Sequence, residues 1–155
     1  DDEALKKAYQ AQVTRFHPDN FANKSQSEQL QALQSTSLVN SAYTALKTPL
    51  NRASYLLNLE DVNPFDEKDT NMDANFLLSQ IELREQLEAI KEQQDNLALD
   101  DFIEQVQDCT RDNVASISKA FTQSRDLQEI KTLVRELKFY EQLSKEANIL
   151  MDEWL

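Results

Sequence analysis

Apolar residues recur at intervals of three and four along most of the chain, the spacing that places them on one face of an α-helix. The first half contains three such segments, at residues 3–16, 26–47 and 49–57. Their apolar positions are Leu5, Ala8, Tyr9, Val13 and Phe16, then Leu30, Leu33, Leu38, Ala42, Ala45 and Leu46, then Leu50, Ala53, Leu56 and Leu57. Because alternating β-branched runs are scarce, the pattern predicts an all-α fold.

The predicted helices of this half are bounded by residues that stop or start helices. Pro18 ends the first helix, because the residue before a proline is displaced from the α region. Ser25 and Glu28 have the spacing of a capping box at the start of the second helix. Thr48 and Pro49 fit the N-cap and N1 positions of the third. We therefore predict a helical hairpin followed by a short helix.

The second half begins with weak periodicity and continues with three long helical patterns. Residues 59–73 hold Asn63-Pro64 and several acids, which is typical of a linker. Apolar stripes then predict helices at about residues 74–93, 100–123 and 126–155. Short connections favour antiparallel neighbours. The sequence therefore predicts a domain at residues 1–58, a linker at 59–73 and a three-helix bundle at 74–155.

The composition of the 155-residue chain excludes several kinds of site. Because it contains no glycine, it has no Gly-rich phosphate-binding loop. Its single cysteine, Cys109, can form no internal disulfide, so we expect a buried thiol and a reducing compartment. One cysteine cannot hold an iron–sulfur cluster, so we expect no cofactor. We expect no signal peptide, because the acidic start is the reverse of a basic n-region, and no apolar run approaches the ~20 residues of a membrane span.

Charge is distributed unevenly between the two predicted domains. Residues 1–58 carry six Lys and Arg against five acids, a balance of +1, whereas residues 59–155 carry ten against 23, a balance of -13. A nucleic-acid partner is disfavoured, because phosphate binding requires a positive surface. The asymmetry indicates two functional units with different partners.

The tripeptide His17-Pro18-Asp19 directly follows the first helix and contains the only histidine of the chain. The proline stiffens the turn and keeps its two polar neighbours out of the helix, so little entropy is lost when they dock. Lys6, Lys7 and Arg15 add positive charge suited to an acidic partner surface. The alternatives are a chance tripeptide and a histidine that only interacts with the helix dipole. We expect a contact motif rather than a catalytic site.

The segment 74–93 carries more apolar residues than one groove can bury. A seam with helical spacing already runs from Phe76 to Ile90, and further apolar residues widen the apolar face beyond it. The predicted interaction patch, with its polar rim, comprises Leu77, Leu78, Ile81, Glu82, Arg84, Glu85 and, displaced from the stripe of the last helix, Phe139. A contiguous exposed apolar patch usually marks a partner site, although these residues could instead belong to the core.

Several stretches of the chain resemble one family of J-domain proteins. These are Arg15-Phe16-His17-Pro18-Asp19 with Phe21-Ala22, residues 39–49 (VNSAYTALKTP), residues 52–57 (RASYLL), residues 76–85 (FLLSQIELRE) and Leu137-Lys138-Phe139. Together they are similar to the HscB family, the J-domain co-chaperones of iron–sulfur cluster assembly. The usual first J-domain helix has no counterpart here, so we expect part of the apolar surface of residues 1–58 to lack its cover and a preceding helix to be missing from the chain.

The resemblance implies an adaptor with two partners and no enzymatic activity of its own. A specialised DnaK-family chaperone, HscA-like, would contact His17, Pro18, Asp19, Lys6, Lys7 and Arg15. An iron–sulfur scaffold protein, IscU-like, would bind the predicted interaction patch. The implied location is the cytoplasm, or the mitochondrial matrix in a eukaryote. Alternatives are a general J-domain co-chaperone and a helical interaction module with a different client. A hydrolase that uses His17 and Asp19 lacks a nucleophile.

Overall fold

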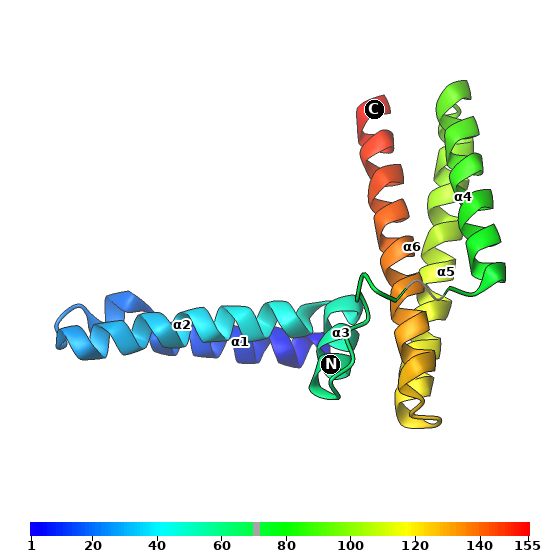
Figure 1. Cartoon of the computed structure of the whole chain (residues 1–155). Helices are drawn as coiled ribbons and strands as arrows, with labels where there is room; N and C mark the ends of the chain where they lie inside the picture. The colour runs from blue at the N-terminus through cyan, green and yellow to red at the C-terminus, as the bar shows by residue number, and fades with distance from the viewer. Residues whose placement is uncertain (70–71) are drawn as a thin grey trace. The chain divides into compact units, whose positions relative to one another are not determined.

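The structure, a computed structural model, describes residues 1–69 and 72–155 and contains helices but no strand within them (Figure 1). The elements are α1 (Asp2–Phe16), the 3-10 helix η1 (Pro18–Phe21), α2 (Gln26–Lys47), α3 (Pro49–Leu59), α4 (Ala74–Gln93), α5 (Asn96–Thr122) and α6 (Leu127–Trp154). The predicted all-α class is confirmed. The chain divides into two compact units, Asp1–Tyr55 and Leu56–Leu155.

The helix ends follow local capping chemistry, as the sequence predicts. Ser25 and Glu28 form the reciprocal capping box, and Thr48 Oγ1 accepts the Asn51 amide at 3.2 Å. The start of α5 differs from the prediction by four residues. It lies at Asn96 because the Asp95 carboxylate accepts the backbone N–H groups of the following turn at 3.0 Å.

In the first unit α1 and α2 lie side by side as a helical hairpin (Figure 1). The predicted α1 stripe faces inward only partly, because α1 contains no fully buried residue. Polar and aromatic contacts join the two helices instead. The Tyr9 ring stacks on Tyr43 with 4.0 Å between ring centroids, and the Tyr9 hydroxyl donates to Asn40 Oδ1 at 2.7 Å. This unit is therefore held by specific contacts more than by a large core.

The inward face of α2 differs from the predicted one. Leu30, Leu33 and Leu38, which we placed on the apolar face, are 55%, 58% and 71% exposed. Ala32 is buried instead, and Thr36 is partly buried on the same side. Since residues four apart share a helix face, Ala32 and Thr36 lie on the side of α2 that contacts α1, which farther along includes Tyr43, and the leucines fall outside it. The expectation that this unit leaves apolar surface uncovered is confirmed.

The start of α3 is tied to both helices of the hairpin through Arg52. Its guanidinium donates to the Leu46 carbonyl at 2.9 and 3.1 Å, near the C-terminal end of α2. The same group donates to the Asp2 carboxylate at 3.0 Å. One side chain therefore satisfies a helix-end carbonyl and joins the two ends of the hairpin.

The second unit contains the predicted three-helix bundle. Helices α5 and α6 run alongside each other over most of their length, and α4 packs against one end of the pair (Figure 1). The core at that end consists of Phe76, Leu83, Leu87, Ile90, Leu99, Phe102, Ile103, Val106, Phe139, Leu143 and Ala147. No helix in the described parts of the chain combines the length and the apolarity needed to cross a membrane.

The described part of the predicted linker packs along α6. Phe65 lies under the Lys138 ammonium, with 4.3 Å between Nζ and the ring centroid. The Asp69 carboxylate pairs with Lys131, and the Arg135 guanidinium donates to the Asp69 carbonyl at 2.9 Å. The three cations recur at four- and three-residue spacing, so they form one row on α6. The rest of the predicted linker includes residues 70 and 71, which lie outside the described residues.

A polar pair of one buried and one half-buried residue lies between α5 and α6. The side-chain amide of Asn113 donates to the Leu133 carbonyl at 3.1 Å and to Glu136 Oε2 at 3.4 Å, and its Oδ1 atom is buried without a hydrogen-bond partner in the described chain. Burial, and then the nearby charge of Asp73, raise the pKa of the Glu136 carboxyl, while the Asn113 bond opposes them. An ionised Glu136 therefore costs stability here.

Replacing Glu136 by Gln is expected to stabilise the second unit at neutral pH by about 1 kcal/mol, because the new amide also offers a donor to Asn113 Oδ1. Glu136 contributes a loss of stability that develops as pH rises from 4.5 through its raised folded pKa. In the Gln variant the free energy of unfolding should therefore fall less than in wild type as pH rises above 4.5. Chemical denaturation from pH 4 to 8 measures this. Glu104→Gln, an exposed position of α5, is the control, and equal pH profiles for both variants would contradict the assignment.

Candidate functional site

The turn after α1 places His17 and Asp19 outside the helix, as the proline predicts. His17 has an extended backbone, with φ -57° and ψ 130°, and Pro18 opens the short helix η1. The side chains of His17 and Asp19 are 51% and 91% exposed. Both polar groups are therefore accessible to a partner, on a turn whose backbone is stiffened by the proline ring.

The imidazole of His17 is oriented by the backbone of the same turn. The Asp19 amide donates to His17 Nδ1 at 3.2 Å, and the Asp19 carboxylate lies 3.5 Å from the same nitrogen. The shorter of these two contacts is the hydrogen bond, and an accepting Nδ1 carries no proton. With Nδ1 engaged in this way, the donor that the ring offers to a partner is the N–H group at Nε2. The turn therefore presents one N–H donor and one carboxylate side by side.

The three predicted cations of α1 are exposed but do not form a narrow stripe. At 100° per residue, Lys6 and Arg15 lie about 180° apart around the helix, with Lys7 between them. Arg15 lies over the ring of Phe16, 5.1 Å from its centroid. Positive charge is therefore spread over the exposed half of α1 rather than gathered beside His17.

On α4 the predicted separation of core and surplus apolar residues is confirmed. Leu77, Leu78 and Ile81 are 40%, 58% and 54% exposed, whereas Phe76 and Leu83 are buried. Ile81 follows Leu77 by four residues and Leu78 by three, so the three side chains share one helix face. We call these three residues the α4 patch. It is an apolar surface of one helix that the bundle does not use.

Phe139 does not lie on this surface, and its predicted exposure is wrong. Only 9% of it is exposed, and its ring packs edge-on against Phe76 with 5.7 Å between centroids. Phe139, Leu143 and Ala147 recur every four residues and form the α6 side of the core beneath α4. That spacing, rather than the Val134–Leu137 stripe alone, is the sequence signal that identifies Phe139 as buried.

The polar residues predicted at the rim of the patch differ in their engagement. Arg84 pairs with Glu146 of α6 and lies over the Phe139 ring, 5.6 Å from its centroid. Its guanidinium is therefore already used inside the bundle. Glu82 and Glu85 are exposed. Of the predicted rim residues, Glu82 and Glu85 are thus exposed on the same helix as the α4 patch. Arg84 and Phe139 instead make contacts inside the bundle.

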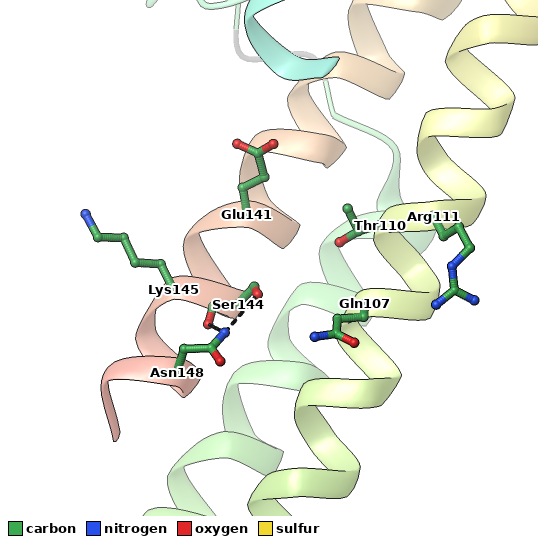
Figure 2. Close-up of a pocket in the computed structure, with 7 residues that line it drawn as sticks. All are labelled: Gln107, Thr110, Arg111, Glu141, Ser144, Lys145 and Asn148. Atoms are coloured by element: carbon green, nitrogen blue, oxygen red, sulfur yellow. Dashed lines mark hydrogen bonds between the residues drawn. The ribbon is translucent and has the colours of Figure 1, made fainter. Parts of the chain in front are cut away.

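A polar groove of about 610 Å³ between α5 and α6 belongs to neither predicted site (Figure 2). Its lining residues are Gln107, Thr110, Arg111, Glu141, Ser144, Lys145 and Asn148. Arg111 is paired with Asp108 at 3.0 Å, and burial raises the pKa of the Glu141 carboxyl. The groove therefore combines side chains of both charge signs with neutral polar groups.

Cys109 is partly buried on α5, so its expected burial is only partial. Burial and the nearby acids Asp112 and Asp108 raise the pKa of this thiol, which therefore stays protonated at neutral pH. No group of three or more His, Cys, Asp and Glu side chains suited to a metal ion occurs in residues 1–69 and 72–155.

Comparison with known proteins gives consistent matches over both units. A family model described as the HSCB C-terminal oligomerisation domain matches residues 72–148. The curated co-chaperone protein HscB homolog of Photobacterium profundum is 38% identical over 137 residues, 88% of this chain and 80% of the relative. That of Vibrio campbellii is 38% identical over 142 residues, 91% of this chain and 82% of the relative.

Solved structures also match this chain. The chaperone HscB from Vibrio cholerae matches with a TM-score of 0.87 and 36% identity, over all of this chain and 91% of that one. Human co-chaperone protein HscB matches with a TM-score of 0.87 and 28% identity, over 96% of this chain and 74% of the human one. The helical hairpin and the three-helix bundle therefore recur together in these proteins.

Proposed function

Because this chain belongs to the HscB family of co-chaperones, we propose that it stimulates ATP hydrolysis by a dedicated DnaK-family chaperone and delivers an iron–sulfur scaffold protein to it. The observation that carries this proposal is the presence of an exposed polar turn and an exposed apolar surface on two separate compact units. The first site is the His17–Asp19 turn, and the second is the α4 patch. The proposed partners are HscA-like and IscU-like, and the proposed location is a reducing compartment, the cytoplasm or the mitochondrial matrix.

The His17–Asp19 turn acts in this proposal by docking, and the chemistry of ATP hydrolysis belongs to the partner. The turn offers a donor, a carboxylate and a rigid backbone, and these match a polar groove better than a reaction centre. Lys6, Lys7 and Arg15 raise the rate of encounter with an acidic surface, an effect that weakens with salt. A tenfold stimulation requires only about 1.4 kcal/mol of transition-state bias in the partner.

The α4 patch acts as the anchor for the scaffold protein. Leu77, Leu78 and Ile81 supply an apolar centre, and Glu82 and Glu85 supply a polar rim, the usual anatomy of a protein interface. Phe139 and Arg84 contribute to binding indirectly, because their contacts hold α4 against α6. The scaffold therefore meets a preformed surface and loses little free energy in ordering it.

Single-turnover ATP hydrolysis by a DnaK-family chaperone tests both halves of the proposal. The chain alone should accelerate hydrolysis. The chain and an iron–sulfur scaffold protein together should accelerate it by more than the product of the factor for the chain alone and the factor for the scaffold alone. No acceleration by the chain with any such chaperone would contradict the first half. Acceleration without synergy, together with no calorimetric binding of the scaffold, would contradict the second half and favour a general J-domain co-chaperone.

A second candidate role for the α4 patch is self-association. The exposed apolar side chains of the α4 patch would suit a second copy of the chain as well as a scaffold. The description of the matching family model, the HSCB C-terminal oligomerisation domain, also mentions oligomerisation. Sedimentation of the chain alone separates the two roles. A monomer at micromolar concentration favours the scaffold, whereas a dimer that Leu77→Ala disperses favours self-association.

A further inference from the structure

The end of α1 lacks three helical hydrogen-bond donors, because one is absent at Pro18 and the turn uses the other two itself. If the helix continued, the N–H groups of residues 18, 19 and 20 would donate to the carbonyls of residues 14, 15 and 16. Pro18 has no N–H group. The Asp19 amide donates to His17 Nδ1 at 3.2 Å, and the Asn20 amide donates to the His17 carbonyl at 3.0 Å. The end of α1 is therefore left with carbonyls that need other partners.

Two side chains supply partners for two of these carbonyls, those of Thr14 and Phe16. Asn20 Nδ2 donates to the Thr14 carbonyl at 2.8 Å, the same carbonyl that the missing Pro18 N–H would have served. Thr36 of α2 donates from its hydroxyl to the Phe16 carbonyl at 2.9 Å, across 20 residues of sequence. One donor therefore comes from within the turn, and the other comes from the neighbouring helix.

The Thr36 hydroxyl also lies 2.9 Å from the Ala32 carbonyl, and one proton serves one acceptor at a time. Ala32 is the residue four before Thr36, so the helical N–H of Thr36 can serve its carbonyl. The corresponding donor for Phe16, the Asn20 amide, is already used by His17. The Phe16 carbonyl is therefore the one that lacks a helical donor, so we assign the Thr36 hydroxyl proton to it.

We propose that Thr36 and Asn20 are positioning residues that set the direction in which the His17–Asp19 turn leaves α1. Since α1 contains no fully buried residue, apolar packing alone does not fix its C-terminal end on α2. The Thr36 bond is partly buried and ties that end to the second helix. The inference rests on the proposed docking function of the turn, because it assigns these residues to the presentation of His17 and not to contact with the chaperone.

Thr36→Val removes the hydroxyl at nearly constant shape, and Thr36→Ser restores it. His17 is the only histidine, so its ring gives isolated NMR signals that report the turn directly. We expect Thr36→Val to shift those signals and to raise the concentration needed for half-maximal ATPase stimulation by about 2- to 12-fold, the range expected for one hydrogen bond. Thr36→Ser should return both readouts to the wild-type values.

Thr44→Val is the matched control, because the Thr44 hydroxyl of the same helix donates only to its own helix, to the Asn40 carbonyl at 3.0 Å. It should change neither readout. Asn20→Ala, at an exposed position, should shift the His17 signals in a protein that stays folded, so it decides the matter if Thr36→Val unfolds the hairpin. Wild-type His17 signals and stimulation in Thr36→Val or Asn20→Ala would overturn the positioning role. If wild-type protein stimulates no chaperone, the proposed function fails, while the NMR comparison still decides the positioning role.

Discussion

Replacing His17 by Gln is expected to abolish stimulation of the partner ATPase while both units stay folded. The side chain is half exposed and belongs to no core cluster, so its loss costs little stability. Gln has no rigid ring that can accept the Asp19 amide and present an N–H group in a fixed direction. We expect single-turnover hydrolysis to fall at least about tenfold relative to wild type, a loss of more than about 1.4 kcal/mol.

The control for His17→Gln is Lys24→Gln in the same loop, a residue outside the proposed docking site. It should stimulate hydrolysis as well as wild type does. Calorimetric affinity for the scaffold protein should be unchanged in both variants, because the α4 patch lies on the other unit. Full stimulation by His17→Gln would remove the turn from the mechanism and leave a helical interaction module as the better interpretation.

Local sequence signals predict the helices well, because caps and proline act within a few residues. The capping box at Ser25 and Glu28 lies where it was predicted, and α1 ends before Pro18. Without glycine, the left-handed turns after α4 and before α6 fall on Gln94 and Arg125, with φ of 51° and 50°. Such turns normally favour glycine, and their positions could not be assigned from residue type.

Tertiary packing is harder to predict, because periodicity identifies a stripe but not the element that covers it. Leu30, Leu33 and Leu38 looked like the core of α2, yet the hairpin contact uses the smaller Ala32. Phe139 looked surplus, yet α4 covers it through Phe76. In both cases the partner helix, and not the hydrophobicity of the residue, determines which residue is buried.

The candidate sites show the same division between local and tertiary information. The sequence identifies the His17–Asp19 turn and the leucines of α4, because each signal lies within a few residues. It does not reveal that Thr36 reaches the Phe16 carbonyl or that Arg84 pairs with Glu146. These contacts join residues distant in sequence, and nothing in residue type or spacing distinguishes Thr36 from Thr44.

The α4 patch gives the second large expected effect. Replacing Leu77, Leu78 and Ile81 together by Ala should weaken scaffold affinity at least about 100-fold, because exposed apolar side chains that become buried centrally in an interface each contribute about 1 kcal/mol or more. The stability of the chain should change by less than about 1 kcal/mol, since these side chains are 40% to 58% exposed in the free protein. Isothermal titration with the scaffold protein measures the first quantity and chemical denaturation the second.

Leu97→Ala is the matched control, because this α5 leucine of the same unit is 80% exposed and lies outside the patch. It should bind the scaffold with wild-type affinity. Phe139→Ala provides the opposite comparison. Its ring is buried in the core, so it should lose about 3 to 5 kcal/mol of stability and weaken binding only through the displaced α4.

Stimulation of the chaperone ATPase by the triple variant alone should equal that of wild type, whereas synergy with the scaffold should disappear. This combination separates the two units functionally, since the loss lies only where the scaffold contributes. Unchanged scaffold affinity in the triple variant would exclude the α4 patch as the scaffold site. If the variant also sedimented as a smaller species than wild type, the exposed leucines would instead join two copies of this chain.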